Sequence, residues 1–527
     1  MSTRHEDAPR PLVVSAAGAS AADAAAIASG IPSRALMRCA GAAVAAEIAR
    51  RFPGQLGDGV VIATGAGNNG GDGWVVAQWL HAAGIAVRVV ECVEARTPDA
   101  RAERDAAFAL GVPVTRDRDS LANARERIAV DAIVGIGLHA DQPLIGDVAW
   151  GVGALHAFQR SGGTVAAIDI PSGVDATSGD HVGAVPCAVT LTFGTVKRGQ
   201  LVAREQCGEI VAVDIGLGVH VEVAGGAPLA DPRWFRRSLP LIHADAHKGT
   251  RGTVAIVGGA RGMAGAAVLA ARAALHSGAG LVKCVVAAES LPAVQEAVPA
   301  SLATPWPDDD DRARHEIGNW ADAVLIGPGL GRDRARATLE RLLRTFSGPV
   351  VLDADALNAF ENDADSLNAL LGNRPTLLTP HPAEFARVAG GGATVDDVLA
   401  DRFEWPARLA ARTGATVLLK GTPTVVASPA GASTVVAEGT PILATGGAGD
   451  ILGGIAVTLL AQTHDAALAG ALAAFAHGRA ASNTSAHDVR GYTLDDVLRE
   501  LPHVWSLEPR PPRPPIITEL PGPGERR

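Results

Sequence analysis

The sequence has few cysteines and no excess of positive charge. Only 5 cysteines occur in 527 residues, and they are scattered without a CxxC pair. This spacing argues against a disulfide framework and is typical of reduced thiols in a cytosol. The formal net charge is −10, whereas nucleic acids and anionic membranes bind surfaces with a concentrated positive field. We therefore expect no nucleic-acid partner.

Long apolar runs are also missing. The longest ones, Gly453 to Ala461 and Ala466 to Ala476, are separated by Gln462, His464 and Asp465, which leaves nothing long enough to cross a bilayer. The N-terminus, MSTRHEDAPRP, has no apolar core after its charges and therefore lacks the form of a signal peptide. We expect a cytoplasmic protein with no membrane partner.

Apolar residues and glycine dominate what is present. Apolar residues make up 47% of the chain, only 19% is charged, and there are 61 glycines, which mark the strand-to-helix turns of a compact α/β protein. A chain of 527 residues is too long for one core and fits two domains of about 200 to 280 residues. Regular patterning fades between Gly216 and His247, which predicts the connection between the two domains.

A glycine loop follows the first strongly apolar strand. Gly65, Gly67 and Gly70 have the G-x-G-x-x-G spacing, and Glu91 closes the next strand, as in the dinucleotide-binding fingerprint. By that rule alone the chain would be an NAD-dependent oxidoreductase. However, Asp72 places a carboxylate where a diphosphate would lie. A loop of amides and a carboxylate suits a cation or the hydroxyl and amide groups of a ligand better.

Polar residues also end two later strands of the first half. Asp131 lies in an apolar strand that runs into Gly135, and the next strand runs into Asp169 and Ser172. Parallel α/β sheets bind ligands at the carboxyl ends of their strands, so we expect these side chains and Asn69 to converge. Oxygen ligands without histidine or cysteine suit potassium or magnesium. The alternative for Asp131 and Asp169 is a buried carboxylate that caps a neighbouring loop.

Four motifs of the first half carry a family resemblance. They are Asn68 to Asp72, Asp131 with Gly135-Ile136-Gly137, Asp169-Ile170-Pro171-Ser172-Gly173, and Thr192-Phe193-Gly194 with Lys197. With these motifs, roughly residues 12 to 220 resemble the YjeF N-terminal domain, the NAD(P)H-hydrate epimerase fold. The resemblance implies a Rossmann-like three-layer domain, predicted here over residues 12–222, and a potassium ion held by Asn69, Asp131 and Ser172.

The same resemblance implies which residues bind and convert the hydrate. Epimerisation needs only reversible loss and return of a hydroxyl group, for which Asp169 would be the acid and base, a role that Lys197 could share. Arg38-Cys39 departs from the acidic residue and partner usual in the family, so the contacts of that helix, including a dimer face, stay open. The residues implied to bind the hydrate are Asn68, Asn69, Gly70, Gly71, Asp72, Gly135, Ile136, Gly137, Leu138, His139, Ala140, Asp141 and Asp169.

The stretch from Thr445 to Gly454 has the pattern of a reaction centre. Its apolar-to-glycine transition predicts a loop that opens a buried helix, so that Gly446 to Gly449 present free N–H groups at the positive end of that helix. These groups could hold a phosphoryl group while Asp450 takes a proton from a hydroxyl group. The alternative is a glycine-rich turn in which Asp450 only complements the helix dipole.

Several strands of the second half end in polar groups of the same kind. The stretches are His247-Lys248-Gly249, Gly265-Ala266, Gly327-Pro328-Gly329-Leu330-Gly331, Asp353-Ala354-Asp355, Thr379-Pro380-His381-Pro382, Lys420-Gly421 and Gly446 to Asp450. With them, roughly residues 240 to 500 resemble the ribokinase-like superfamily, and more narrowly the ADP/ATP-dependent NAD(P)H-hydrate dehydratases. For His381, which lies between prolines, a structural turn is the alternative to a functional role.

The second resemblance implies two sets of contacts. The residues implied to touch the hydrate are Ala266, Gly329, His381 and Asp450. Those implied to hold the adenine nucleotide are Lys420, Gly421, Thr422, Pro423, Thr424 and Gly449. Magnesium is implied as the metal of this site, and ADP is the better expectation than ATP.

The whole chain is therefore predicted to be α/β and to repair nicotinamide nucleotides. A Rossmann-like three-layer domain, a linker over residues 223–240 and a ribokinase-like three-layer domain over 241–505 would be followed by a proline-rich, mobile tail over 506–527. The first domain would epimerise the R and S hydrates of NADH and NADPH, and the second would dehydrate the S form. We also expect a homo-oligomer.

Two other functions fit parts of the sequence. One is a small-alcohol kinase of the ribokinase type with a Rossmann-like domain that only binds a ligand or a partner, which would release a stable phosphorylated product. The other is an ordinary NAD dehydrogenase, which Asp72 at the glycine loop disfavours.

Overall fold

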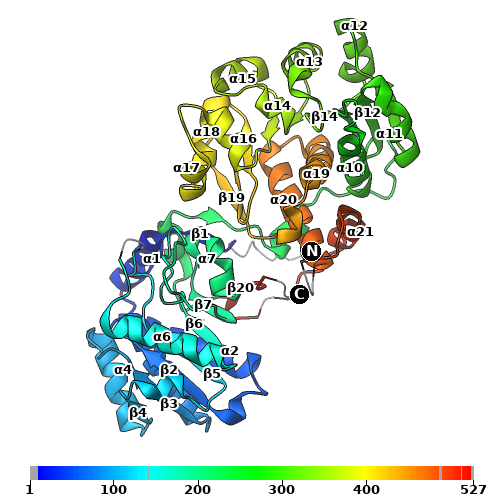
Figure 1. The fold of residues 1–527 in the computed structure, drawn as a ribbon. Coiled ribbons are helices and arrows are strands. Elements are labelled where there is room, and N and C mark those ends of the chain that lie inside the picture. Colours follow the sequence, from blue (N-terminus) through cyan, green and yellow to red (C-terminus); the bar gives the residue numbers. More distant parts are fainter. Residues whose placement is uncertain (1–9, 140–141, 486–488, 512, 524–527) are drawn as a thin grey trace, which may run out of the picture. The chain divides into compact units, whose positions relative to one another are not determined.

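The chain divides into two units in the computed structural model, which describes residues 10–139, 142–485, 489–511 and 513–523. Of these residues, those up to Ala227 and those from Arg510 onward form the first unit, and those within Pro228–Pro509 form the second. Both units are α/β, as predicted (Figure 1). None of the helices within these ranges is long and apolar enough to cross a bilayer.

Short runs of Val, Ile and Ala form the parallel strands of the first unit. Val60 and Ile62 pack on one face of the sheet with residues of α1, α2 and α3, whereas Val61 and Ala63 pack on the other face with residues of α6. Both faces are therefore covered, which gives three layers. The helices are α1 (Ala16–Ala28), α2 (Ser33–Arg51), α3 (Asn68–Ala82) and α6 (Gly146–Arg160). In sheet order, the strands are β20 (Ile516–Leu520), β9 (Glu209–Val213), β7 (Val189–Phe193), β6 (Thr164–Ile168), β5 (Ile128–Ala132), β2 (Val60–Thr64), β3 (Val87–Glu91) and β4 (Val114–Thr115).

Helix α3 begins earlier than the glycine pattern predicts. Its first residue is Asn68, with Gly67 at the N-cap, so most of the expected loop belongs to the first turns of the helix. A Cβ atom on Gly70 would collide with the carbonyl oxygen of Gly65, and one on Gly73 would lie 2.6 Å from the Cβ of Ala132. These glycines therefore allow the helix to approach the strand ends closely.

The prediction of a mobile tail is wrong for Ile516–Leu520. This segment is β20, which pairs antiparallel with β9 at the edge of the sheet. Arg51 Nη2 donates to Glu519 at 2.5 Å, and Arg513 Nη1 donates to Glu47 at 2.7 Å. Prolines flank the strand but do not interrupt it, and an edge strand tolerates them there. The β-branched residues between the prolines favour a strand, which the proline-rich composition of the tail concealed.

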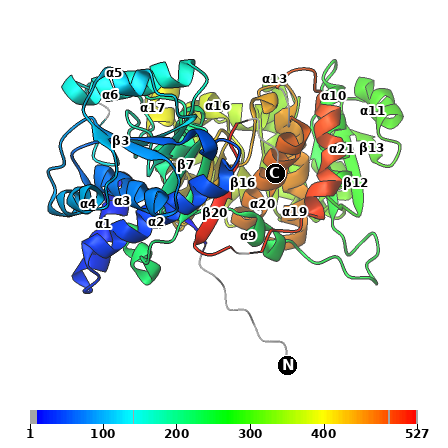
Figure 2. The same ribbon diagram turned by 90° about the horizontal axis from the view of Figure 1, so that it is seen from below.

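The second unit is built on a longer sheet with helices on both faces. Val254 and Ile256 of β11 pack with residues of α10, α19, α20 and α21, whereas Ala255 and Val257 pack with residues of α13, α15, α16 and α18. Helices α19, α20 and α21 lie side by side (Figure 2). The strands in sheet order are β13 (Leu302–Pro305), β12 (Leu281–Val286), β11 (Thr253–Val257), β14 (Ala323–Ile326), β15 (Val350–Leu352), β16 (Thr376–Leu378), β17 (Thr416–Leu419), β18 (Thr424–Ala427) and β19 (Ser433–Val436). The helices are α10 (Ala264–His276), α13 (Arg332–Thr345), α15 (Ala364–Leu371), α16 (Pro382–Ala389), α18 (Trp405–Thr413), α19 (Ala448–Thr463), α20 (Ala466–Thr484) and α21 (Leu494–Trp505).

The segment predicted as a linker, residues 223–240, contains regular structure. Helix α9 (Pro232–Ser238) lies within it and is capped by the side chain of Asp231. Its Phe235 is fully buried in the core of the second unit and stacks on Phe475, with ring centroids 4.4 Å apart. The buried ring of Phe235 fixes this short helix, and its 7 residues are too few for a periodic sequence signal.

Candidate active sites

The first unit has a buried polar cluster at the carboxyl ends of β5 and β6. Asp131 is fully buried, and its carboxylate accepts hydrogen bonds from the Ser172 hydroxyl at 2.6 Å and the Ser172 N–H at 2.8 Å. Burial raises the pKa of Asp131 in spite of these hydrogen bonds and one from Ile133. Asn69 is also buried and packs against Gly135, which follows β5. Neither polar atom of the Asn69 amide has a partner within the described part of the chain.

A second cluster surrounds Asp169, directly after β6. Asp169 has a left-handed backbone with φ 61°, a conformation that is rare outside glycine and concentrates at functional sites. Its Oδ1 accepts from Lys197 Nζ at 2.6 Å and from Thr192 Oγ1 at 3.1 Å. Lys197 Nζ also donates to Thr192 Oγ1 at 2.7 Å, and the Lys197 side chain is only 2% exposed. The structure thus brings two sequence motifs into one ion pair.

Two further carboxyl groups feel the charges of this ion pair. Asp72 is buried, and burial together with the charges of Asp169 and Asp23 raises its pKa well above the usual value. Burial likewise raises the pKa of Asp23, which Lys197 lowers and Asp169 raises further. Sequence reasoning missed Asp23, because its alanine-rich helix α1 carries no motif. Its position in the helix could have indicated it, since Asp23 lies next to Ala22 in the stripe of small residues that α1 buries.

Glu91, the acidic residue of the dinucleotide fingerprint, is not available to a ligand. Its side chain is 1% exposed, and it forms ion pairs with Arg104 at 2.6 Å and Arg116 at 2.7 Å. The fingerprint needs this carboxylate free to accept hydrogen bonds from a ribose. The ion pairs therefore count against the dehydrogenase alternative.

The remaining residues predicted in the first site differ in exposure. Asn68 is exposed at the start of α3, whereas Gly70 and Gly71 are buried behind it. Ile136 is partly buried and packs on the apolar core. Gly137, Leu138 and His139 follow on the partly exposed loop after β5. Ala140 and Asp141 lie outside the described residues.

Arg38, which stands where the family usually has an acidic residue, forms an ion pair inside the first unit. Arg38 Nε donates to Glu103 at 2.8 Å, and Arg34 Nε donates to the same carboxylate at 2.5 Å. Glu103 is fully buried, and its pKa is lowered because hydrogen bonds from Gln78 and the two arginines outweigh its burial. Cys39 is exposed. The basic residue at this position therefore serves a contact between two helices of the unit.

The second unit places Asp450 in the first turn of α19, close to two charged residues. Burial and then the charge of Asp353 raise the pKa of Asp450 to about 7, while Lys420 opposes them. Lys420 Nζ lies 2.8 Å from Asp353 and 3.7 Å from Glu384. Burial alone would lower the pKa of Lys420, but the charges of Asp353 and Glu384 raise it. Asp353 was seen in a motif but not predicted as a site residue.

Backbone N–H groups next to Asp450 are available to a ligand. Helix α19 begins at Ala448, with Gly447 as N-cap in a left-handed conformation of φ 97°. Ala448 donates its N–H to Thr445, whereas the N–H groups of Gly447 and Gly449 have no acceptor in the described part of the chain. A Cβ on Gly449 would lie 3.3 Å from Lys420 Nζ. The N–H groups of Gly447 and Gly449 are therefore free within the described chain, as the predicted anion hole requires, whereas that of Ala448 is not.

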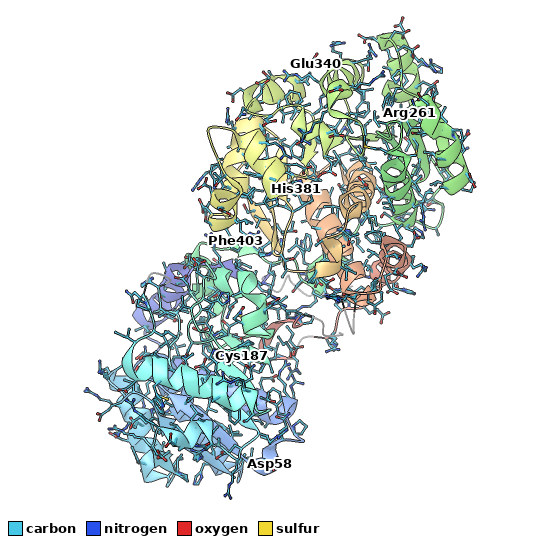
Figure 3. All side chains as sticks on the ribbon, viewed as in Figure 1. Asp58, Cys187, Arg261, Glu340, His381 and Phe403 are labelled. Carbon is cyan, nitrogen blue, oxygen red and sulfur yellow. The ribbon has the colours of Figure 1, made fainter. Side chains whose placement is uncertain are left out.

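His381 caps a helix at the edge of the same cluster (Figure 3). Its Nδ1 accepts from the N–H of Ala383 at 3.1 Å, and the His381 N–H donates to Glu384 at 2.9 Å. Burial lowers the pKa of His381, with Lys420 adding to the effect and Glu384 opposing it. His381 therefore has the structural role in a turn that was expected from the sequence as the alternative to a functional one. Nδ1 serves the cap, and Nε2 lies 3.4 Å from Glu384 Oε1, so both ring nitrogens already face groups of the same turn, although the side chain is 47% exposed.

Ala266 and Gly329, the other two residues predicted to touch the hydrate, lie next to each other. A Cβ on Gly329, which has φ 56°, would be 3.2 Å from the Cβ of Ala266. The Ala260 N–H donates to the Gly329 carbonyl at 2.7 Å, so the loops after β11 and β14 support each other. The nucleotide loop is tied to the His381 turn, because the Lys420 N–H donates to Pro380 at 2.9 Å.

Comparisons with known proteins cover both units. The family described as NAD(P)H-hydrate dehydratase matches residues 254–503, and the family described as YjeF-related protein N-terminus matches residues 33–199. The bifunctional NAD(P)H-hydrate repair enzyme Nnr of Salinibacter ruber is 37% identical, over 96% of this chain and 98% of that protein. The enzyme of the same name from Moorella thermoacetica is 34% identical, over 90% and 92%. A solved structure, the ADP/ATP-dependent NAD(P)H-hydrate dehydratase from Bacillus subtilis co-crystallised with ATP and Mg²⁺, is 30% identical, with a TM-score of 0.47 over 53% of this chain and 98% of that one.

Proposed function

Because this chain belongs to the family of bifunctional NAD(P)H-hydrate repair enzymes, we propose that it performs two consecutive reactions. The first unit interconverts the R and S hydrates of NADH and NADPH. The second unit dehydrates the S form at the expense of ADP or ATP. The observation that carries the proposal is Asp450, a carboxylate with a pKa of about 7 beside unpaired N–H groups at a helix N-terminus.

Asp450 and the N–H groups suit a phosphoryl transfer. Asp450 accepts the proton of the hydrate's hydroxyl group, whose oxygen then attacks the terminal phosphorus of the nucleotide, and AMP leaves from ADP or ADP from ATP. The N–H groups of Gly447 and Gly449 stabilise the charge on the transferred group. The ring nitrogen next to the new phosphate ester expels phosphate, and loss of a proton from the adjacent carbon restores the dihydropyridine. We propose Ala266, Gly329 and His381 as further contacts of the hydrate, and Lys420–Thr424 as contacts of the nucleotide.

The carboxyl groups of the first site suit reversible loss of a hydroxyl group. We propose that Asp72, whose pKa is raised by burial and by the charges of Asp169 and Asp23, gives a proton to the departing hydroxyl group while the ring nitrogen supplies the electrons. Asp169, held by Lys197 and Thr192, then accepts a proton from the water that returns to the other face of the ring. We propose residues Asn68–Asp72 and Gly135–His139 as the walls that orient the hydrate.

The residues of the first site fit a potassium ion. Both polar atoms of Asn69 lack partners among the residues that the structure describes, and Asp131 is a fully buried carboxylate. A cation bound by Asn69, Asp131 and Ser172 would satisfy the amide oxygen and offset the buried charge. Such an ion would supply fixed positive charge near the hydrate's polar groups. We propose this ion as a structural part of the site.

Magnesium in the second site would need the nucleotide. Among the described residues, no group of three or more His, Cys, Asp or Glu side chains is arranged to hold a metal ion. Mg²⁺ commonly binds through one or two carboxylates and substrate phosphates, and Asp353 and Glu384 are the carboxylates nearest Lys420. We propose that Mg²⁺ enters with the nucleotide and neutralises phosphate charge.

Two broader expectations from the sequence also stay proposals. We propose that the protein works in the cytoplasm and that it is a homo-oligomer. Free cysteines, of which Cys92, Cys187, Cys207 and Cys284 are buried, are compatible with a reducing compartment.

The rate of dehydration should fall as the pH drops through about 7. Only the charged form of Asp450 accepts a proton, and its pKa is about 7, so at pH 6 about one tenth of the high-pH rate should remain. The pH–rate profile at saturating nucleotide measures this. In Asp353→Asn the inflection should move to lower pH, since the charge of Asp353 raises the pKa of Asp450. A profile without an inflection near 7, or unmoved in this variant, would contradict the role of Asp450.

The dehydratase proposal is tested with pure (S)-NADH hydrate. With ADP or ATP, potassium and magnesium, the chain should release one phosphate for each NADH formed, and without nucleotide it should form none. A small-alcohol kinase would instead leave the hydrate unchanged and phosphorylate other alcohols to stable products. Measuring NADH by absorbance and phosphate in the same sample separates the two outcomes.

A further inference from the structure

Arg402 is a buried cation without an acid beside it. It lies in the turn before α18, next to Phe403 labelled in Figure 3, and is only 9% exposed. Its Nη1 donates to the Pro423 carbonyl at 3.2 Å, and burial lowers its pKa. No carboxylate of the described residues forms an ion pair with it, and the adjacent Asp401 pairs with Arg408 at 2.8 Å. A buried cation without a carboxylate beside it lowers the stability of the fold unless a bound anion pairs with it.

Arg374 in the same unit shows how a structural arginine is satisfied. It also lacks an acid, and burial lowers its pKa. However, Nε, Nη1 and Nη2 of Arg374 each donate to a backbone carbonyl, at 2.8, 2.9 and 3.0 Å. Arg402 has one such bond, so its remaining N–H groups can donate hydrogen bonds to an anion.

The free part of Arg402 lies beside the proposed nucleotide loop. A Cβ on Gly421 would be 3.1 Å from Nη1 and 3.2 Å from Nη2 of Arg402, so a side chain at this position would crowd the guanidinium. Gly421 and Thr422 are exposed, and no nitrogen of Arg402 is among the fully buried atoms without partners. The guanidinium therefore opens to solvent at this loop. The neighbouring cation, Lys420, is already engaged by Asp353 and Glu384.

We propose that Arg402 binds a phosphate group of one of the two substrates of the second unit, at Gly421. This inference rests on the proposed function, because both the adenine nucleotide and the dinucleotide hydrate carry phosphate. The planar guanidinium can donate two parallel hydrogen bonds to phosphate oxygens, and the bound anion neutralises the buried charge. Arg402 is thus a binding residue that the sequence motifs do not contain.

The test compares Arg402→Met with Arg374→Met in the full chain. Calorimetric titration with ADP and with adenosine should show that Arg402→Met weakens ADP binding by about 10- to 100-fold, the value of one or two charge-assisted hydrogen bonds. Adenosine affinity should be unchanged, since adenosine has no phosphate. Arg402→Lys should restore part of the loss. Arg374→Met should bind both ligands as the wild-type chain does.

Stability separates a ligand contact from a structural role. Arg402→Met removes a buried charge and a single hydrogen bond, to the Pro423 carbonyl, and these two changes oppose each other in stability, so ligand-free Arg402→Met should melt close to the wild-type chain. Arg374→Met should melt lower, because three carbonyl groups lose their donors. Lower melting of Arg402→Met with unchanged binding of both ADP and the S hydrate would overturn the inference.

The source of the phosphate follows from a second titration with the S hydrate. Weaker binding of ADP assigns the phosphate to the nucleotide, and weaker binding of the hydrate alone assigns it to the dinucleotide. Full affinity for both in Arg402→Met overturns the inference and leaves the proposed function intact. A wild-type chain that binds neither ADP, ATP nor hydrate would instead refute the proposed function itself.

Discussion

The Asp450→Asn variant is expected to lose nucleotide-driven dehydration by about 10³-fold, while it still epimerises the hydrates at the wild-type rate. The amide keeps the size of the side chain and its place in the first turn of α19 but cannot take a proton from the hydroxyl group. The measurement is the rate of NADH formation from the S hydrate at saturating ADP or ATP. Epimerisation is followed separately on the pure R form.

A matched variant tests whether Asp450 only complements the helix dipole. Asp333 is an exposed acid in the first turn of α13, so Asp333→Asn removes a dipole contact, worth about 0.3–1 kcal/mol of stability, without touching the site. If the two variants lose similar stability and both dehydrate normally, Asp450 has no catalytic role.

The Asp169→Asn variant is expected to lose epimerisation by about 10²- to 10⁴-fold. Asparagine tolerates the left-handed backbone that Asp169 adopts, so the change removes the proton acceptor and little else of the local geometry. With nucleotide and a mixture of both hydrates, NADH formation should stop when the S form is consumed. Asp180→Asn, a change at an exposed acid downstream in the same loop region, should leave salvage complete.

The loss of charge at Asp169 leaves Lys197 buried without its partner, which costs about 3–5 kcal/mol in buried ion pairs. A poorly folded first unit would then imitate a catalytic defect. The double variant Asp169→Asn/Lys197→Met removes both charges and should recover stability without recovering epimerisation. Recovery of epimerisation in the double variant would contradict the role of Asp169.

The sequence was most informative where one strand runs directly into polar residues. Asp131, Asp169, His381 and Lys420 were all recognised at strand ends, and parallel strands bring such ends to one edge of a sheet. Both predicted α/β units follow from the same buried Val and Ile runs, and the assignment of the family and of the enzyme is confirmed by the comparisons.

What escaped prediction depends on contacts between distant segments. Glu91 fits the dinucleotide fingerprint by spacing, and only the tertiary contacts with Arg104 and Arg116 reveal its structural use. The edge strand β20 depends on β9, which lies some three hundred residues earlier in the chain. Asp23 adjoins a buried stripe of its helix, but Lys197 and Asp169, the charges that act on it, lie on other elements. No period or motif encodes such pairings within a single window of sequence.

The central claim is that one chain salvages both epimers, with one site for each reaction. It is tested most directly by the recovery of dihydronicotinamide absorbance from a mixture of R and S NADH hydrate with ADP or ATP, potassium and magnesium. We predict full recovery by the wild-type chain, arrest at the S fraction in Asp169→Asn, and no recovery in Asp450→Asn. Absence of recovery by the wild-type chain with either nucleotide would contradict the claim.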